Sequence, residues 1–315
     1  ANLDVETSEN SIQESIAQIY IQILYAAESV KVNESTLQVS IAQRDRGQEL
    51  LNAGSIAKSD LAQLEAQVST DRYQLVTAQA TLQDYKLQLK QLLELDGENE
   101  MNVYLPALSD ENVLLPLPTK KDVYMSALTL RPEIEASKLS VEASELGIDI
   151  AKAGYLPTIS LSAGIGTNHT SGSDFTFGEQ VKNGWNNSIG VSVSVPIFNN
   201  RQTKSAVQKA KLQRETSLLS LLDEQKTLYK TIEGLWLDAN SAQQRYAAAN
   251  EKLKSTQISY DLISEQFNLG MKNTVELLTE KNNLLQAQQE QLQAKYMAIL
   301  NTQLLKFYQG DKLAL

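Results

Sequence analysis

The sequence predicts a mainly α protein of long antiparallel coiled-coil helices that also contains one β-hairpin. Three observations predict this fold class: an internal repeat, heptad spacing within each repeat, and two short segments in which apolar and polar residues alternate. The composition agrees, because 14 Gly, 6 Pro and 6% aromatic residues among 315 leave little material for a loop-rich globule.

An internal repeat organises the helical part of the chain. When Gly54 is aligned with Gly270, at an offset of 216 residues, apolar, acidic and amide positions coincide without a gap. Helical periodicity alone would match the apolar positions but not the acids, the amides and the glycines. We therefore expect two long helical hairpins, at residues 1–95 with a tip near 52–58 and at residues 199–310 with a tip near 268–274. Other matched pairs are Ile12–Leu228, Ile16–Ile232, Tyr20–Trp236, Glu49–Glu265, Asn52–Asn268 and Asp60–Glu276.

Heptad spacing within each hairpin is typical of a coiled coil. Asp71 is the one polar break in the first seam. An ordinary helix bundle would also satisfy this spacing, but a helix over about 203–266 would be on the order of 95 Å long, which compact bundles seldom need. The seam residues are Leu61, Val68, Leu75, Leu82 and Leu89 in the first hairpin and Leu278, Leu285, Leu292 and Ile299 in the second.

The region between the hairpins differs in composition. Residues 96–131 hold three of the six prolines and predict an irregular segment followed by a short helix over Lys120–Leu130. Pro132 suits the first position of a helix, so a helix is expected over 132–156. Residues 311–315 form a tail.

Two segments alternate with the period of two that a strand imposes, over 158–166 and 188–197. They predict a β-hairpin over 157–198 with a polar loop over 167–187. Its apolar face suits either lipid or a layer of helices, and periodicity alone does not choose between the two. That face comprises Ile159, Leu161, Ile165, Ile189, Val191, Val193 and Val195.

Charge and residue counts argue against several functions. A net charge of −10 and the absence of a basic cluster argue against a nucleic-acid partner. There is no cysteine, and the single histidine, His169, has no histidine or cysteine partner for a metal or nucleophile site. Gly164 and Gly166 lack the third glycine and the helix of a dinucleotide fingerprint. We therefore expect no enzyme activity, no cofactor and no metal.

Four segments of the chain are distinctive: the run RPEIEASKLSVEASELGIDIAKAGYLPTISLSAGIG, the turn VSVPIFNN, and the paired segments LNAGSIAKSDLAQLEAQ and FNLGMKNTVELLTEKNN. Together they resemble the TolC family of outer-membrane efflux channels of Gram-negative bacteria. The resemblance implies a homotrimer with a shared β-barrel in the outer-membrane lipid and an α-helical tunnel across the periplasm. It also implies a periplasmic adaptor and an inner-membrane pump as partners, and passive passage of small molecules or proteins.

The resemblance assigns roles to residues at the two tips. It implies that Asp60 and Lys272 pair to hold the tips closed, that Phe267 lies at the constriction, and that Glu276 faces the pore. On the sequence alone, these acids and glycines fit equally well as ordinary helix caps. The implied adaptor-docking residues are Asn52, Gly54, Ser55, Asn268, Gly270 and Met271.

The repeat also indicates which part of the family pattern this chain contains. At the offset of 216, nothing in the chain corresponds to the helix, strand, loop and strand of residues 132–200. Relative to the family we therefore expect a chain that lacks its N-terminal helix and first β-hairpin. The rival function is a periplasmic helical adaptor or coiled-coil scaffold, although an adaptor should have one hairpin flanked by β-rich modules.

Overall fold

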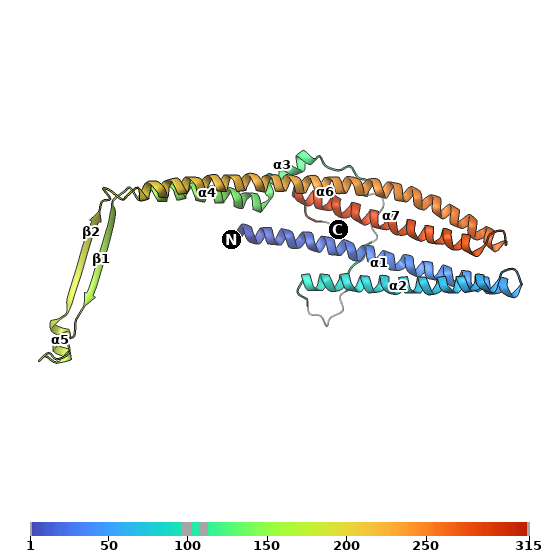
Figure 1. Cartoon of the computed structure of the whole chain (residues 1–315), viewed down its shortest axis with the longest axis horizontal. Helices are drawn as coiled ribbons and strands as arrows, with labels where there is room; N and C mark the ends of the chain where they lie inside the picture. Colours follow the sequence, from blue (N-terminus) through green and yellow to red (C-terminus); the bar gives the residue numbers. More distant parts are fainter. Residues whose placement is uncertain (1, 96–101, 107–112, 314–315) are drawn as a thin grey trace. The chain divides into compact units, whose positions relative to one another are not determined.

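The structure is a computed structural model that describes residues 2–95, 102–106 and 113–313. The predicted fold class is confirmed, since long helices dominate and one two-stranded antiparallel sheet accompanies them (Figure 1). None of the described helices has the length and apolar character needed to cross a membrane. In chain order the elements are α1 (Asn2–Asn52), α2 (Lys58–Leu92), α3 (Lys120–Leu130), α4 (Pro132–Ala153), β1 (Thr158–Gly166), α5 (Phe177–Asn183), β2 (Asn186–Ser194), α6 (Gln202–Asn268) and α7 (Thr274–Gln309).

The chain divides into two compact units. Residues 1–135 and 225–315 form the first, which we call the helical unit, and residues 136–224 form the second, which we call the strand unit. Parts of the irregular segment expected over 96–131, namely 96–101 and 107–112, lie outside the described residues, as do the last two residues of the expected tail.

The helical unit contains two antiparallel hairpins, which we call hairpin one and hairpin two (Figure 1). Hairpin one is α1–α2, and hairpin two is formed by residues 225–268 of α6 together with α7. Away from the tips they pack through an apolar cluster in which residues of α1 meet residues of α7. We call it the apolar clamp. Its buried members are Ala17, Ile21, Leu24, Leu292, Tyr296, Leu300 and Leu304.

Side chains of α6 form hydrogen bonds with the segment 113–119, which precedes α3. The Trp236 indole donates to the Pro118 carbonyl at 3.0 Å, and the Gln243 amide donates to the carbonyls of Val113 and Leu115 at 2.9 and 2.8 Å. Because these donors reach main-chain carbonyls, they satisfy polar groups that no secondary structure pairs.

Arg131 joins three parts of the helical unit. The following Pro132 holds it in the extended region, with ψ of 124°, which ends α3. Its guanidinium donates to Glu133 at 2.8 Å and to Glu14 of α1 at 3.0 Å. It also lies 4.0 Å from the ring centre of Tyr308 near the end of α7. These contacts bind the start of α4 to both hairpins.

In the strand unit, α4 lies antiparallel to the first part of α6. The hydroxyls of Ser144 and Ser217 are 2.7 Å apart, and Arg214 donates to Glu145 at 2.9 Å. Past Ala153 the chain turns into β1, which pairs with β2 in an antiparallel ladder.

The strand hairpin differs from the prediction at both ends of β2 and in the loop between the strands. β1 has the expected bounds, whereas β2 begins at Asn186 and ends at Ser194, before Val195. Pro196 accounts for the early end, because it restricts the residue before it and cannot donate to a ladder. The loop expected to be irregular contains α5, which begins with a capping contact in which the Thr176 amide donates to Glu179 at 2.9 Å.

Candidate functional site

The two hairpin tips share one backbone conformation. α1 ends at Asn52 and α6 at Asn268, after which Gly54 and Gly270 take φ values of +75° and +73°. In each tip the amide after the glycine donates to the carbonyl five residues before it. This left-handed helix stop favours glycine because it has no Cβ. The offset of 216 residues therefore relates the tips in the structure as it does in the sequence.

Asp60 and Glu276, the matched acids, cap the helices that leave the tips. The Ala57 amide donates to Asp60 at 3.0 Å, and the Asn273 amide donates to Glu276 at 3.2 Å. An acid in the first turn also interacts favourably with the positive end of the helix. The sequence left two interpretations of these acids open, gate residues or ordinary helix caps. Within a single chain, both acids act as helix caps.

Within the single chain, Lys272 pairs with an acid of its own hairpin, and the pairing with Asp60 in a closed assembly stays a prediction. Its ammonium lies 2.6 Å from the Glu276 carboxylate, four residues along the chain, whereas Asp60 is engaged at the start of α2. Pairing within one turn is favoured because residues four apart lie on one face of a helix. The Lys272 hydrogen bond and the Asn273 amide hold the pKa of the Glu276 carboxyl below its usual range.

Phe267 is buried within the single chain, where the residue is only 3% exposed. An aromatic ring without a hydroxyl gains most by full burial. Phe267 therefore contributes to the packing of the tip, and its place at a constriction formed by several chains stays a prediction.

The residues expected to dock a partner are all exposed at the tips. They are Asn52, Gly54, Ser55, Asn268, Gly270 and Met271. The sequence reasoning missed Leu269 and Val275, which are exposed beside Met271. Their signal was apolar character at a helix end, where no neighbouring turn covers a side chain. Tip two therefore exposes large apolar side chains beside its polar ones, whereas the exposed residues of tip one are small or polar.

Asp71, the polar break in the first heptad seam, forms a buried ion pair that the sequence did not reveal. Its carboxylate contacts the Lys281 ammonium of α7 and accepts from the Ser40 hydroxyl of α1. The Asp71 and Lys281 side chains are 1% and 4% exposed. Burial lowers the pKa of Lys281, and the contact with Asp71 opposes that effect.

The strand hairpin segregates its side chains by face. Ile159 is paired with Val193 and Leu161 with Val191, whereas Ser160 on the opposite face is paired with Ser192. A shift of one residue would mix the faces, so this register agrees with the alternation in the sequence. The expected lipid-facing residues, including Val195 just beyond β2, are between 60% and 83% exposed.

Aromatic residues gather beside the end of the strand hairpin that carries α5. Phe175, Phe177 and Trp185 are all exposed there. The ring centres of His169 and Phe177 are 5.3 Å apart. Exposed aromatic residues at one end of an apolar strand surface are typical of a boundary between lipid and water.

Comparison with known proteins places this geometry in a family. The family model described as "Outer membrane efflux protein" matches residues 123–310. The chain belongs to the outer membrane efflux protein family. This match includes the strand hairpin and the whole of α7, and thus most of the features described above.

Individual relatives agree with this membership. The chain is 25% identical over 294 residues to the outer membrane efflux protein BepC of Brucella suis, covering 93% of this chain and 61% of BepC. It is 25% identical over 311 residues to the outer membrane protein TolC of Escherichia coli, covering 94% of this chain and 60% of TolC. The chain thus spans about three fifths of the length of these relatives.

Solved structures show the same fold. The structure of CusC superposes with a TM-score of 0.83 at 19% identity, over 99% of this chain and 71% of that one. The outer-membrane channel OprN superposes with a TM-score of 0.79 at 19% identity, over 98% of this chain and 67% of that one.

Proposed function

We propose that this chain forms part of an outer-membrane channel of an efflux or export system in a Gram-negative bacterium. The observation that carries the proposal is the strand hairpin, whose register places one apolar and one polar face on opposite sides. Among the residues that the structure describes, both strands are exposed along their whole length, and lipid on one side with water on the other would satisfy both faces.

The long hairpins would form the periplasmic part of the channel. α6 alone has 67 residues, about 100 Å at 1.5 Å per residue, which suits a tunnel better than a compact bundle. In this proposal the protein is a homotrimer, its strands contribute to a shared β-barrel, and its tips face a periplasmic adaptor and an inner-membrane pump. The tip residues named above would make the adaptor contact.

The role would be passive conduction rather than catalysis. The names of relatives include alkaline protease secretion for AprF, cation efflux for CusC and pyoverdine export for OpmQ. One fold that serves such different cargo is best explained by a wide conduit, with selection made elsewhere in the assembly.

Bilayer conductance of the full-length protein, including the helix and strand hairpin that the family pattern places before residue 1, tests the proposal. Discrete, stable current steps across a planar lipid bilayer are expected. A full-length protein that inserts into lipid and never conducts would contradict the channel and favour a helical scaffold, the rival function.

The tips are tested separately with Lys272→Gln. Removing this ammonium leaves the Glu276 carboxylate without its partner, so a ring of such carboxylates would attract cations more strongly. We expect higher single-channel conductance and stronger cation selectivity. Lys254→Gln is the matched control, because Lys254 is also an exposed lysine paired with a nearby glutamate, at 2.9 Å. Unchanged conductance and selectivity in Lys272→Gln would contradict a pore-facing role for Glu276.

A further inference from the structure

The buried cluster of Ser40, Asp71 and Lys281 joins three helices from both hairpins. Lys281 of α7 donates to Ser40 of α1 and to Asp71 of α2, and Ser40 itself donates to Asp71. The other carboxylate oxygen of Asp71 accepts from Gln67 at 2.9 Å. Both oxygens of the acid are therefore satisfied, which a buried charge requires.

The ion pair and hydrogen bonds of this cluster require one particular alignment of the helices along their axes, which apolar packing does not. Asp71 occupies a seam whose neighbours Leu64 and Val68 are buried and apolar, so a leucine would satisfy packing at that position. A slip of one helical turn, about 5 Å, would separate Asp71 from Lys281 and leave two unpaired charges in the interior. Apolar side chains tolerate such a slip much better.

Along the helices, the cluster lies between the tips and the apolar clamp. Asp71 is about 20 Å from the start of α2 and Lys281 about 10 Å from the start of α7, at 1.5 Å per residue. The clamp begins at Leu24 on α1 and Leu292 on α7, on the side away from the tips.

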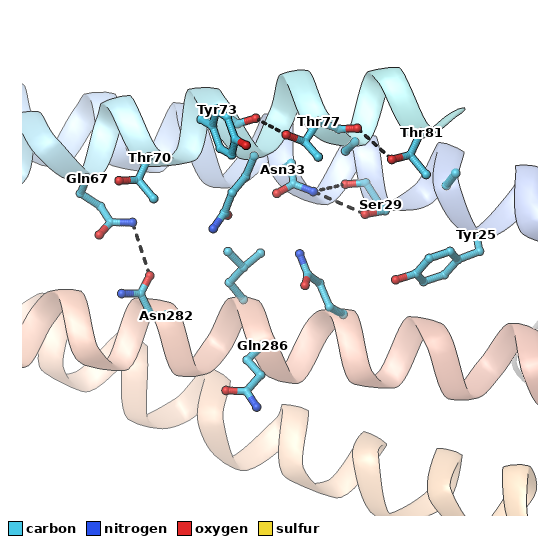
Figure 2. Close-up of a pocket in the computed structure, with 15 residues that line it drawn as sticks. Tyr25, Ser29, Asn33, Gln67, Thr70, Tyr73, Thr77, Thr81, Asn282 and Gln286 are labelled. Atoms are coloured by element: carbon cyan, nitrogen blue, oxygen red, sulfur yellow. Dashed lines mark hydrogen bonds between the residues drawn. The ribbon is translucent and has the colours of Figure 1, made fainter. Parts of the chain in front are cut away.

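A groove of about 600 Å³ separates the cluster from the apolar clamp (Figure 2). Hydroxyl and amide side chains line much of it, among them Ser29, Asn33, Thr77 and Gln286. Figure 2 shows Gln67 of α2 reaching Asn282 of α7 across this space, at 3.4 Å, whereas Gln286 extends from α7 away from hairpin one. Over this stretch, buried apolar residues such as Leu285 alternate with polar side chains and open space, so the apolar packing between the clamp and the tips is interrupted.

We propose that the Ser40–Asp71–Lys281 cluster is a register lock between the two hairpins. The apolar clamp holds the hairpins together at one end, and the lock fixes how their tip-ward halves are aligned. This property belongs to the helical unit and goes beyond the proposed channel function. Gln43, which donates to Tyr260 of α6 at 2.8 Å, adds a neutral contact between the hairpins on the tip side of the lock.

The absence of cysteine makes the lock measurable, because two introduced cysteines would be the only thiols in the chain. Spin labels at Ser55→Cys and Met271→Cys, both exposed, report the distance between the tips by pulsed electron–electron double resonance. Labels at Ile12→Cys and Met297→Cys, also exposed, report the clamp end. The unsubstituted background should give one narrow distance distribution for each label pair.

The decisive variant is Asp71→Leu combined with Lys281→Met, which replaces the ion pair by apolar side chains. We expect it to keep its helicity and its melting temperature, since apolar pairs often replace buried ion pairs without loss. The tip distances should nevertheless spread by about one helical turn, roughly 5 Å, while the clamp distances stay narrow. The control replaces the exposed pair Lys252–Glu290, 2.7 Å apart within hairpin two, by Met and Leu and should change neither distribution.

Each other result overturns the lock. A tip distribution as narrow as in the unsubstituted chain would mean that the pair does not set the register. Loss of helicity in the apolar variant would mean that the charges serve folding as a whole. Charge exchange provides a second test. We expect Asp71→Lys alone and Lys281→Asp alone each to broaden the distribution of tip distances, and the two together to narrow it again. A double variant whose tip distances stay broad would count against the lock.

Discussion

Tyr308 should make the helical unit lose stability at alkaline pH. Its ring is 8% exposed and lies against Arg131, with Glu14 and Glu133 nearby. Burial, followed by the negative charge of Glu14, raises the pKa of the Tyr308 phenol from 10.0 to about 12. The folded state therefore holds this proton more tightly than the unfolded state does.

The size and direction of the effect follow from that difference. Each pKa unit corresponds to about 1.36 kcal/mol, so the phenol contributes at most about 2.7 kcal/mol to the free energy of unfolding. Because the folded pKa is the higher one, this contribution is fully present below pH 10 and is lost as the pH rises to about 12.

The assay is urea unfolding from pH 9 to 12, followed by Trp236 fluorescence in a Trp185→Phe background, which leaves one tryptophan. Other groups also titrate between pH 9 and 12, so we compare the free energy of unfolding of this background with that of Tyr308→Phe in the same background. The difference between the two free energies should shrink with rising pH by up to about 2.7 kcal/mol. Tyr73→Phe, at an exposed tyrosine, should show no such trend. A Tyr308→Phe difference that is constant from pH 9 to 12 would refute the reasoning.

Three further predictions concern the clamp, a tip and the strand hairpin. Ile21→Ala, in the buried clamp, should lower the free energy of unfolding by about 2–5 kcal/mol in urea, whereas exposed Ile12→Ala should cost less than about 1 kcal/mol. Gly270→Ala should cost about 1–2 kcal/mol through its φ of +73° alone, because an added Cβ meets nothing within 4 Å; an unchanged urea midpoint would contradict this. Val191→Lys should reduce flotation with lipid vesicles, because a lysine facing lipid costs about 2–4 kcal/mol of insertion free energy. Ser192→Lys on the opposite face should float normally, and equal loss of flotation in both variants would argue against a lipid-facing side.

The parts of the fold that local chemistry decides could be predicted from the sequence. Gly54 and Gly270 end their helices through a backbone conformation that depends on a few neighbouring residues, so the repeat located both tips. β1 was equally clear from its alternation. Helix α5 was missed although Thr176 and Glu179 have capping-box spacing, because seven residues show too little periodicity to reveal a helix.

Contacts between distant segments could not be predicted in the same way. The heptad break at Asp71 was visible, but Lys281 lies 210 residues away and only the packing of α7 on hairpin one brings it close. At the tips, the sequence did not indicate that Lys272 pairs with Glu276 of its own hairpin within one chain. The position of Phe267 in the family pattern likewise did not indicate that this residue is buried.

The attachment of residues 113–119 to α6 has a consequence for how this protein can vary. Trp236 and Gln243 donate hydrogen bonds to main-chain carbonyl oxygens, which every residue possesses, while the Leu114 and Leu115 side chains remain exposed. These hydrogen bonds therefore do not depend on which side chains the segment carries. Substitutions should accumulate freely along its exposed positions, whereas the helix that holds it tolerates little change at Trp236 and Gln243.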